Sequence, residues 1–394
     1  MDSSGMRISL CAAALALVSA LSLAAALPAH AQTETILYSF GTQSDDGSNP
    51  YAGLIMDPEG NLYGTTYYGG AYDYGTVFKL APSGTETVLY SFGGRRGDGW
   101  YPQAGLIIDT EGNLYGTTSE GGAYGYTNGT VFKLTSSGTE TVLYSFHGFG
   151  SQSHDGYYPL GGLIMDTAGN LYGTTAQGGT YDLGTVFKLT PSGTETLLHS
   201  FAGQPSDGAR PYAGLITDKA GNLYGTTAQG GYGFGTVFKV TPSGTETVLH
   251  RFLGDGASPF AGLIMDENGN LYGTTYQGRR GYGTVFELSA TGKATVLYSF
   301  TGGSDGANPT AGLVMDENGN LYGAAAYSEG TVFELSPGKK GAAWTFTLLH
   351  AFGSQSGDGI RPFGTLILDK EGNLYGTTYA GGANAEGAVF KVTP

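Results

Sequence analysis

The segment Gly-Asn-Leu-Tyr-Gly occurs seven times in this chain and constrains its fold more than any other feature. Successive copies begin 48 to 57 residues apart. The copies begin at Gly60, Gly112, Gly169, Gly221, Gly269, Gly319 and Gly372. A period of about 50 residues is typical of propellers and repeat arrays, in which each repeat is one supersecondary unit. One repeat unit therefore predicts the architecture of the whole chain.

Each repeat contains four short segments with strand composition. In the first repeat they are 52–56, 61–66, 76–80 and 86–92, which are rich in β-branched and aromatic residues and separated by Gly, Pro, Asp or Ser. No stretch after the N-terminal leader keeps an apolar period of 3.6, so we expect no helix there. Four antiparallel strands in each of seven repeats predict an all-β, seven-bladed β-propeller.

The two ends of the chain distinguish a closed ring from an open stack of hairpins. Residues 34–40 form a fourth strand without a blade, and the chain stops at 388–392, which is a third strand. Pairing the N-terminal strand with the C-terminal blade closes the ring and covers two edges that an open stack would expose. We therefore predict one propeller domain over residues 32–394.

Two glycines of the repeated segment have expected roles. Gly60 opens the motif at a turn, where a left-handed conformation suits glycine. Gly64 lies inside the second strand, and we expect it to permit close approach between neighbours.

Residues 1–31 have the features of a cleaved signal peptide. Arg7 precedes an apolar run at 8–27, and Ala29-His30-Ala31 has the small-x-small pattern of a cleavage site. An uncleaved membrane anchor is the alternative, which the polar residues after Ala31 disfavour. The only cysteine, Cys11, lies in this leader, so the mature chain has no disulfide. We expect a secreted or periplasmic protein, monomeric and without a membrane span in its mature part.

Composition excludes some partners. The net charge is −15, with 33 acidic and 18 basic residues. Such a surface disfavours nucleic acid and anionic membranes. The 70 glycines could indicate disorder, but the 28 tyrosines recur in register with the repeat, which indicates an ordered protein.

The loops between the second and third strands are long, rich in Gly and Tyr, and variable. If the first strand is innermost, they emerge on the same face as the fourth-to-first connections. The loop of the fifth repeat contains Arg279-Arg280, whereas that of the sixth is shortened to Tyr327-Ser328-Glu329. Function is often carried by variable loops on a rigid scaffold. The tyrosines that we select there as ligand-binding candidates are Tyr72, Tyr74, Tyr124 and Tyr126.

Each fourth-to-first connection contains Asp-Gly followed by Pro. The candidate aspartates are Asp46, Asp98, Asp155, Asp207, Asp255, Asp305 and Asp358. Aromatic rings stack on sugar rings, and carboxylates accept hydrogen bonds from hydroxyls, so we predict a glycan or a protein partner. The alternative is that the Asp-Gly residues only stabilise the turns and the tyrosines only cover the ends of the blades. A second set of aspartates, which begins with Asp57 in the first-to-second turn, is interpreted as bonding its own backbone. Ca²⁺ is the one cofactor that either set could suggest, and the identity of any metal stays open.

Signatures of catalysis are missing. The sequence has no His-Glu-x-x-His, Gly-x-Ser-x-Gly or phosphate-loop pattern. His199, His250 and His350 occupy a fourth-strand position that is tyrosine in the other repeats, which indicates a structural role. His154, beside Asp155, is the one local His/carboxylate pair. We assign no catalytic residue and favour a binding scaffold. A metal-assisted lyase or hydrolase at the channel mouth and a purely structural cell-surface repeat are the alternatives.

The whole repeat resembles a known family. Gly-Asn-Leu-Tyr-Gly-Thr-Thr, Gly-Gly, Gly-Thr-Val-Phe-Lys-Leu and Leu-Tyr-Ser-Phe together resemble the GloVer (Gloeo/Verruco) tandem repeat over nearly all of the chain after the leader. This resemblance implies an exported bacterial protein of propeller type, and no activity or site residue comes with it. The family is described as having C-terminal anchors, whereas here Pro394 directly follows the last strand. The Gly-Gly pair also resembles Kelch propellers, but the spacing after the second strand differs.

Overall fold

The structure is a computed structural model that describes residues 33–148, 155–339 and 342–394. In this part of the chain there is no α-helix, and hence none long and apolar enough to cross a membrane. Gln32–Pro394 form one compact unit. The predicted signal peptide at 1–31 and His154 lie outside the described residues.

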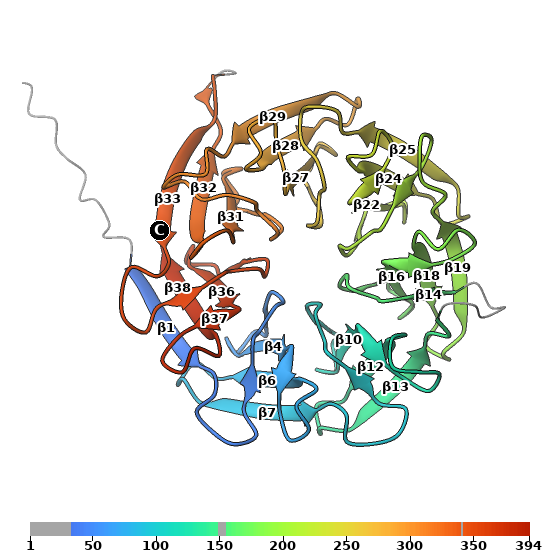
Figure 1. Ribbon diagram of the computed structural model, residues 1–394, viewed down its shortest axis with the longest axis vertical. Coiled ribbons are helices and arrows are strands. Elements are labelled where there is room, and N and C mark those ends of the chain that lie inside the picture. Colours follow the sequence, from blue (N-terminus) through green and yellow to red (C-terminus); the bar gives the residue numbers. More distant parts are fainter. Residues whose placement is uncertain (1–32, 149–154, 340–341) are drawn as a thin grey trace, which may run out of the picture. The chain divides into compact units, whose positions relative to one another are not determined.

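Seven four-stranded antiparallel sheets surround a common axis as the blades of a propeller, as predicted (Figure 1). The short first strand of each blade lies nearest the axis, and the fourth strand forms the outer edge. Blades 1 and 2 consist of β3 (Ile55–Met56), β4 (Leu62–Thr66), β6 (Thr76–Leu80) and β7 (Glu86–Ser91), then β9 (Ile107–Ile108), β10 (Leu114–Thr118), β12 (Thr130–Leu134) and β13 (Glu140–Ser145).

The next blades repeat this order. Blade 3 consists of β15 (Ile164–Met165), β16 (Leu171–Thr175), β18 (Thr185–Leu189) and β19 (Glu195–Ser200). Blade 4 consists of β21 (Ile216–Thr217), β22 (Leu223–Thr227), β24 (Thr236–Val240) and β25 (Glu246–Arg251). Blade 5 consists of β26 (Ile264–Met265), β27 (Leu271–Thr275), β28 (Thr284–Leu288) and β29 (Ala294–Ser299). Blade 6 consists of β30 (Val314–Met315), β31 (Leu321–Ala325), β32 (Thr331–Ser336) and β33 (Thr345–Ala351).

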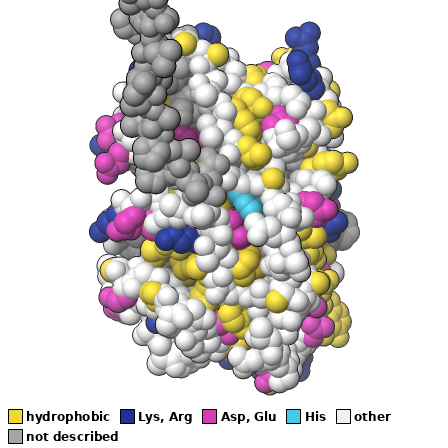
Figure 2. Space-filling model, turned by 90° about the vertical axis from the view of Figure 1, so that its left-hand side faces the viewer, with side chains coloured by type: hydrophobic (Ala, Val, Ile, Leu, Met, Phe, Trp, Pro, Cys, Tyr) yellow, Lys and Arg dark blue, Asp and Glu magenta, His cyan; other side chains and the backbone are white. Residues whose placement is uncertain are grey.

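Blade 7 closes the ring with strands from both ends of the chain. It contains β35 (Ile367–Leu368), β36 (Leu374–Thr378), β38 (Ala388–Thr393) and, as its fourth strand, β1 (Thr33–Ser39). β1 pairs antiparallel with β38 from Thr33↔Thr393 to Ser39↔Ala388. The predicted closure is confirmed. Figure 2 views this side of the molecule, where acidic and basic side chains are interspersed.

The repeated motif begins in a tight turn stabilised by its aspartate. Gly60 has a φ of 83°, the left-handed conformation expected of it. The Oδ1 atom of Asp57 accepts hydrogen bonds from the backbone N–H groups of Glu59 and Asn61, and Oδ2 accepts from the side chains of Asn61 and Tyr63. The same carboxylate contacts recur in all seven turns. These aspartates therefore serve the turn itself.

The close approach expected at Gly64 is present, and the neighbours are side chains of the same blade. Gly64 is directly opposite Phe78 in the pairing of β4 with β6. A Cβ atom on Gly64 would lie 2.7 Å from the Phe78 ring and 2.9 Å from a methyl group of Leu54, both in the same blade. The glycine makes room for a phenylalanine across the strand pair.

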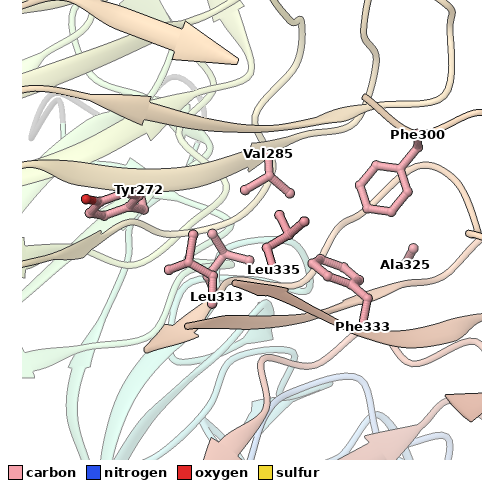
Figure 3. Close-up of a cluster of buried hydrophobic side chains, with 8 residues drawn as sticks. Tyr272, Val285, Phe300, Leu313, Ala325, Phe333 and Leu335 are labelled. Atoms are coloured by element: carbon pink, nitrogen blue, oxygen red, sulfur yellow. The ribbon is translucent and has the colours of Figure 1, made fainter. Parts of the chain in front are cut away.

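Phenylalanines join neighbouring blades instead. Phe40, just after β1, contacts Phe78 of blade 1 edge to face, with ring centroids 5.1 Å apart. Equivalent pairs with centroid distances of 5.0 to 5.3 Å occur at all seven boundaries. Figure 3 shows the boundary between blades 5 and 6, where Phe300, Phe333 and Leu335 pack with Leu313 and Val285. The core is thus a ring of similar clusters, each completed by two blades.

Candidate functional site

One face of the ring is built from the two loop types that vary most along the sequence. The fourth-to-first loop of each boundary lies beside the second-to-third loop of the following blade, and at five boundaries they form a two-stranded ribbon. The ribbons are β2 (Gly47–Ser48) with β5 (Tyr68–Gly69), β8 (Gly99–Trp100) with β11 (Glu120–Gly121), β14 (Gly156–Tyr157) with β17 (Gln177–Gly178), β20 (Gly208–Ala209) with β23 (Gln229–Gly230), and β34 (Gly359–Ile360) with β37 (Ala380–Gly381). We call this surface the loop face.

The seven candidate aspartates lie beneath the loop face and bond to the chain. All except Asp255 are less than 10% exposed. Asp46 accepts hydrogen bonds from the Tyr38 hydroxyl at 2.8 Å and from the Thr42 backbone N–H at 2.9 Å. Each aspartate lies next to the fourth-strand Tyr or His that precedes it. The pairs are Tyr38–Asp46, Tyr90–Asp98, Tyr144–Asp155, His199–Asp207, His250–Asp255, Tyr298–Asp305 and His350–Asp358. The carboxylates thus fasten each loop to its strand, except at His350–Asp358, where the two atoms are 3.5 Å apart without a hydrogen bond.

This pairing also explains the histidines in the tyrosine position. An imidazole N–H and a phenol hydroxyl can each donate to the same carboxylate, so His199 and His250 stand in for tyrosine at 3.1 Å and 2.7 Å from their aspartates. His147 is different, because it follows its strand. Its Nδ1 lies 2.8 Å from an oxygen of Asp155, and its ring stacks on Tyr124 with centroids 4.1 Å apart.

The four candidate tyrosines are on the loop face but do not form one cluster. Tyr126 is 75% exposed, and Tyr72 and Tyr124 are also exposed. Tyr74 stacks on Trp100, with centroids 4.6 Å apart, and Tyr126 lies against the same indole at 5.2 Å. Trp100 thereby joins two of the candidates. Sequence reasoning missed Trp100, although an aromatic residue directly after Asp-Gly was a visible signal.

A second aromatic set follows the prolines of the Asp-Gly loops. The residue after the proline of each Asp-Gly loop is Tyr51, Tyr212, Phe260 or Phe363 in four blades. Tyr51 and Phe363 stack with centroids 4.9 Å apart, and Phe260 contacts Tyr212 and Tyr276 at 5.4 Å and 5.2 Å. These positions vary among repeats, which was the signal that could have identified them.

The shortened loop of blade 6 leaves a pocket on the loop face. Its volume is about 420 Å³. Aromatic walls come from Tyr276, Tyr327 and Phe363, and polar groups from Asn308, Thr310 and Arg361. The Oγ1 atom of Thr310 is buried and has no hydrogen-bond partner in the protein. We call this cavity the blade 6 pocket. The repeat is interrupted here, and the shortened loop contributes Tyr327 and Ser328 to the lining.

The axial channel is lined by glycine backbone and aliphatic side chains. Its cavity of about 270 Å³ is lined mainly by the Gly-Leu pairs before the first strands. A Cβ atom on Gly53 would lie 2.4 Å from the Thr365 carbonyl oxygen, and one on Gly364 would lie 2.5 Å from that of Ala52. Apart from Thr365, the residues that line this cavity offer no side-chain polar group. A metal-assisted centre would need carboxylates or imidazoles, and none of the residues that line this cavity carries one.

Comparisons with known proteins agree with the propeller fold. The extracellular domain of a putative one-component system from B. thetaiotaomicron is similar at 11% identity and a TM-score of 0.55, over 91% of this chain and 40% of that one. This chain therefore spans less than half of that structure. A putative 6-phosphogluconolactonase from Bacteroides uniformis is similar at 16% identity and a TM-score of 0.50, over 83% of this chain and 89% of that one. At such identities the similarity shows the fold alone.

Sequence comparison gives the family. No curated protein matches the chain. The family model described as the Gloeobacter/Verrucomicrobia repeat matches residues 25–232 and 126–330. Together these matches cover most of the chain, including five complete blades. The protein belongs to the Gloeobacter/Verrucomicrobia repeat family.

Proposed function

We propose that this protein is an exported binding scaffold that holds a glycan in the blade 6 pocket. The observation that carries the proposal is the combination of aromatic walls and polar groups in one cavity of about 420 Å³. Small-molecule sites typically have about 300–1,000 Å³ and a few polar groups among apolar walls. The signal-like leader and the family resemblance support export.

The lining chemistry suits a sugar. Tyr327 is 59% exposed, so its ring is available for stacking against the apolar face of a pyranose. The buried Thr310 hydroxyl gains a partner if a ligand hydroxyl reaches it. Arg361, at the rim, would additionally favour a sugar that carries a carboxylate. The loop aspartates contribute indirectly, since they position the loops that form the walls.

A protein partner is the second candidate, and it rests on a different observation. Exposed tyrosines are spread along the loop face at Tyr72, Tyr124, Tyr126, Tyr181 and Tyr232. Tyrosine is enriched in protein interfaces because it combines apolar area with a hydrogen-bonding hydroxyl. Such an interface would use the outer loops and the Tyr74–Trp100–Tyr126 stack, away from the pocket.

A glycan array with the untagged protein tests the proposal, followed by variants that separate the two surfaces. Tyr327→Ala and Arg361→Ala alter the pocket. Tyr232→Ala is the matched control, because Tyr232 is 56% exposed on the same face but belongs to blade 4. We expect the pocket variants to bind the selected glycan at least tenfold more weakly and the control to bind normally.

Two results would count against the pocket. Absence of any glycan binding would remove the glycan proposal. Loss of binding in a Tyr124→Ala/Tyr126→Ala variant, with the pocket variants unaffected, would assign the ligand to the blade 2 loop and not to the pocket.

A further inference from the structure

At five boundaries between blades, the loop aspartate lies near a glutamate that is the first or second residue of the next fourth strand. The two carboxylates are close enough to repel each other. The pairs are Glu34 with Asp358, Glu86 with Asp46, Glu140 with Asp98, Glu195 with Asp155, and Glu246 with Asp207. At the other two boundaries the strand register puts Ala294 and Phe346 in this position.

Histidine joins such a carboxylate pair at two boundaries. Between blades 6 and 7 the group is Glu34, His350 and Asp358, with one potential ligand atom from each within 4.8 Å of the others. His199, Asp207 and Glu246 form a similar group between blades 3 and 4. In each group the glutamate and the histidine come from the outer strands of two successive blades, β1 and β33 or β25 and β19 (Figure 1).

The two groups differ in how many of their polar side-chain atoms have hydrogen-bond partners within the protein. Asp207 accepts hydrogen bonds from His199 and from the backbone N–H groups of Ala202 and Gly208, so both of its oxygens have partners. In this group only Glu246 has a buried side-chain oxygen without a hydrogen-bond partner.

In the group between blades 6 and 7, each of the three residues has a buried polar atom without a hydrogen-bond partner. His350 Nε2, Asp358 Oδ1 and Glu34 Oε1 are buried and have no hydrogen-bond partner. Asp358 is only 8% exposed, and its Oδ2 lies 3.5 Å from His350 Nε2. Buried polar atoms without partners are costly and uncommon. A cation that accepts electron pairs from all three residues would satisfy them together.

The donor set indicates the class of ion. One imidazole nitrogen and two carboxylates suit Zn²⁺ and related divalent transition metals, whereas Ca²⁺ takes oxygen ligands throughout. A divalent cation would offset the repulsion between the two carboxylates.

The geometry points to a Zn²⁺-type site formed by Glu34, His350 and Asp358 that fastens the ring closure. Glu34 is on β1, the strand that closes the ring, whereas His350 and Asp358 come from blade 6 and the loop after it. The ion would tie the closing strand to a blade with which it does not pair. The only cysteine is Cys11, so no disulfide can do this.

Zn²⁺ titration of the chelator-treated, untagged chain by calorimetry, with metal analysis after dialysis, tests the site. His350→Tyr is the informative variant, because tyrosine pairs with the loop aspartate at other boundaries, as Tyr38 does with Asp46. His250→Tyr is the matched control, since His250 pairs with Asp255 where Ala294 replaces the glutamate. We expect one Zn²⁺ per chain in the wild type and in the control, and at least tenfold weaker binding in His350→Tyr.

Thermal unfolding tests whether the bound ion stabilises the ring closure. With Zn²⁺ at 100 times its dissociation constant, the melting temperature should rise by roughly 3 °C for a chain of this size. Glu34→Gln should remove both the rise and the binding, and it serves as the binding test if His350→Tyr does not fold. No saturable Zn²⁺ binding, or binding and a temperature rise that survive in His350→Tyr and Glu34→Gln, would overturn the proposal.

Discussion

The stability of this protein should decrease between pH 5 and pH 8.5 because of the boundary glutamates, and Glu86 gives the clearest test. Burial, and then the charge of Asp46, raise the pKa of Glu86 from 4.5 to about 7. The folded state therefore holds the Glu86 proton more tightly than the unfolded state. This contribution is fully present below pH 4.5 and is lost as the pH rises through 7.

The magnitude follows from the pKa change. A change of this size corresponds to about 3 kcal/mol, and partial solvent exposure of Glu86 reduces it to about 1–2 kcal/mol. Replacing Glu86 with Gln removes the charge and keeps the shape. Glu86→Gln should therefore raise the free energy of unfolding by about 1–2 kcal/mol at pH 8.5 and change it little at pH 5.

Urea unfolding followed by far-UV circular dichroism at the two pH values measures this difference. Glu59→Gln, on an exposed turn, is the control and should show no pH-dependent gain. The turn aspartates do not interfere. Burial tends to raise the pKa of Asp57, but hydrogen bonds from Asn61 and Tyr63 outweigh it, so the pKa is lowered from 3.8 and its contribution is lost only in more acidic solution. An equal effect of Glu86→Gln at both pH values would refute the reasoning.

Three further predictions concern the fold. Gly60→Val should lower stability by about 1–2 kcal/mol, because φ is 83° there, and an unchanged melting temperature would contradict this. Gly64→Ala should cost about 1–3 kcal/mol through overlap with the Phe78 ring, and Gly64→Ala combined with Phe78→Leu should recover part of that loss in the same melting experiment. Deleting residues 33–39 exposes the edge of β38 and should cause aggregation in size-exclusion chromatography, whereas a monodisperse monomer would argue against ring closure as a stabilising feature.

The sequence predicted those parts of the fold that repeat. Blade number, strand order and closure follow from periodicity and from the two incomplete end units, because each blade uses the same local turns and strands. The partner of Gly64 was harder to assign, since both a facing Phe78 and a neighbouring blade can require a glycine. Only the register of β4 with β6 distinguishes these cases.

The candidate site was predicted less completely, because it depends on contacts between repeats. Whether Asp46 faces solvent is decided by Tyr38, which approaches it from the preceding strand. The blade 6 pocket arises where a loop is short, and its walls come from three different blades. Periodicity identifies the face on which such loops gather. The cavity itself depends on the residues that the shortened loop of blade 6 lacks.

The central claim is that the regular part of the repeat forms the scaffold and the interruption at blade 6 binds the ligand. Calorimetric titration of the array-selected glycan into wild-type, Tyr327→Ala and Tyr232→Ala proteins tests this most directly. We predict a single site whose affinity falls at least tenfold in Tyr327→Ala and is unchanged in Tyr232→Ala. Equal affinity in all three proteins would contradict the account.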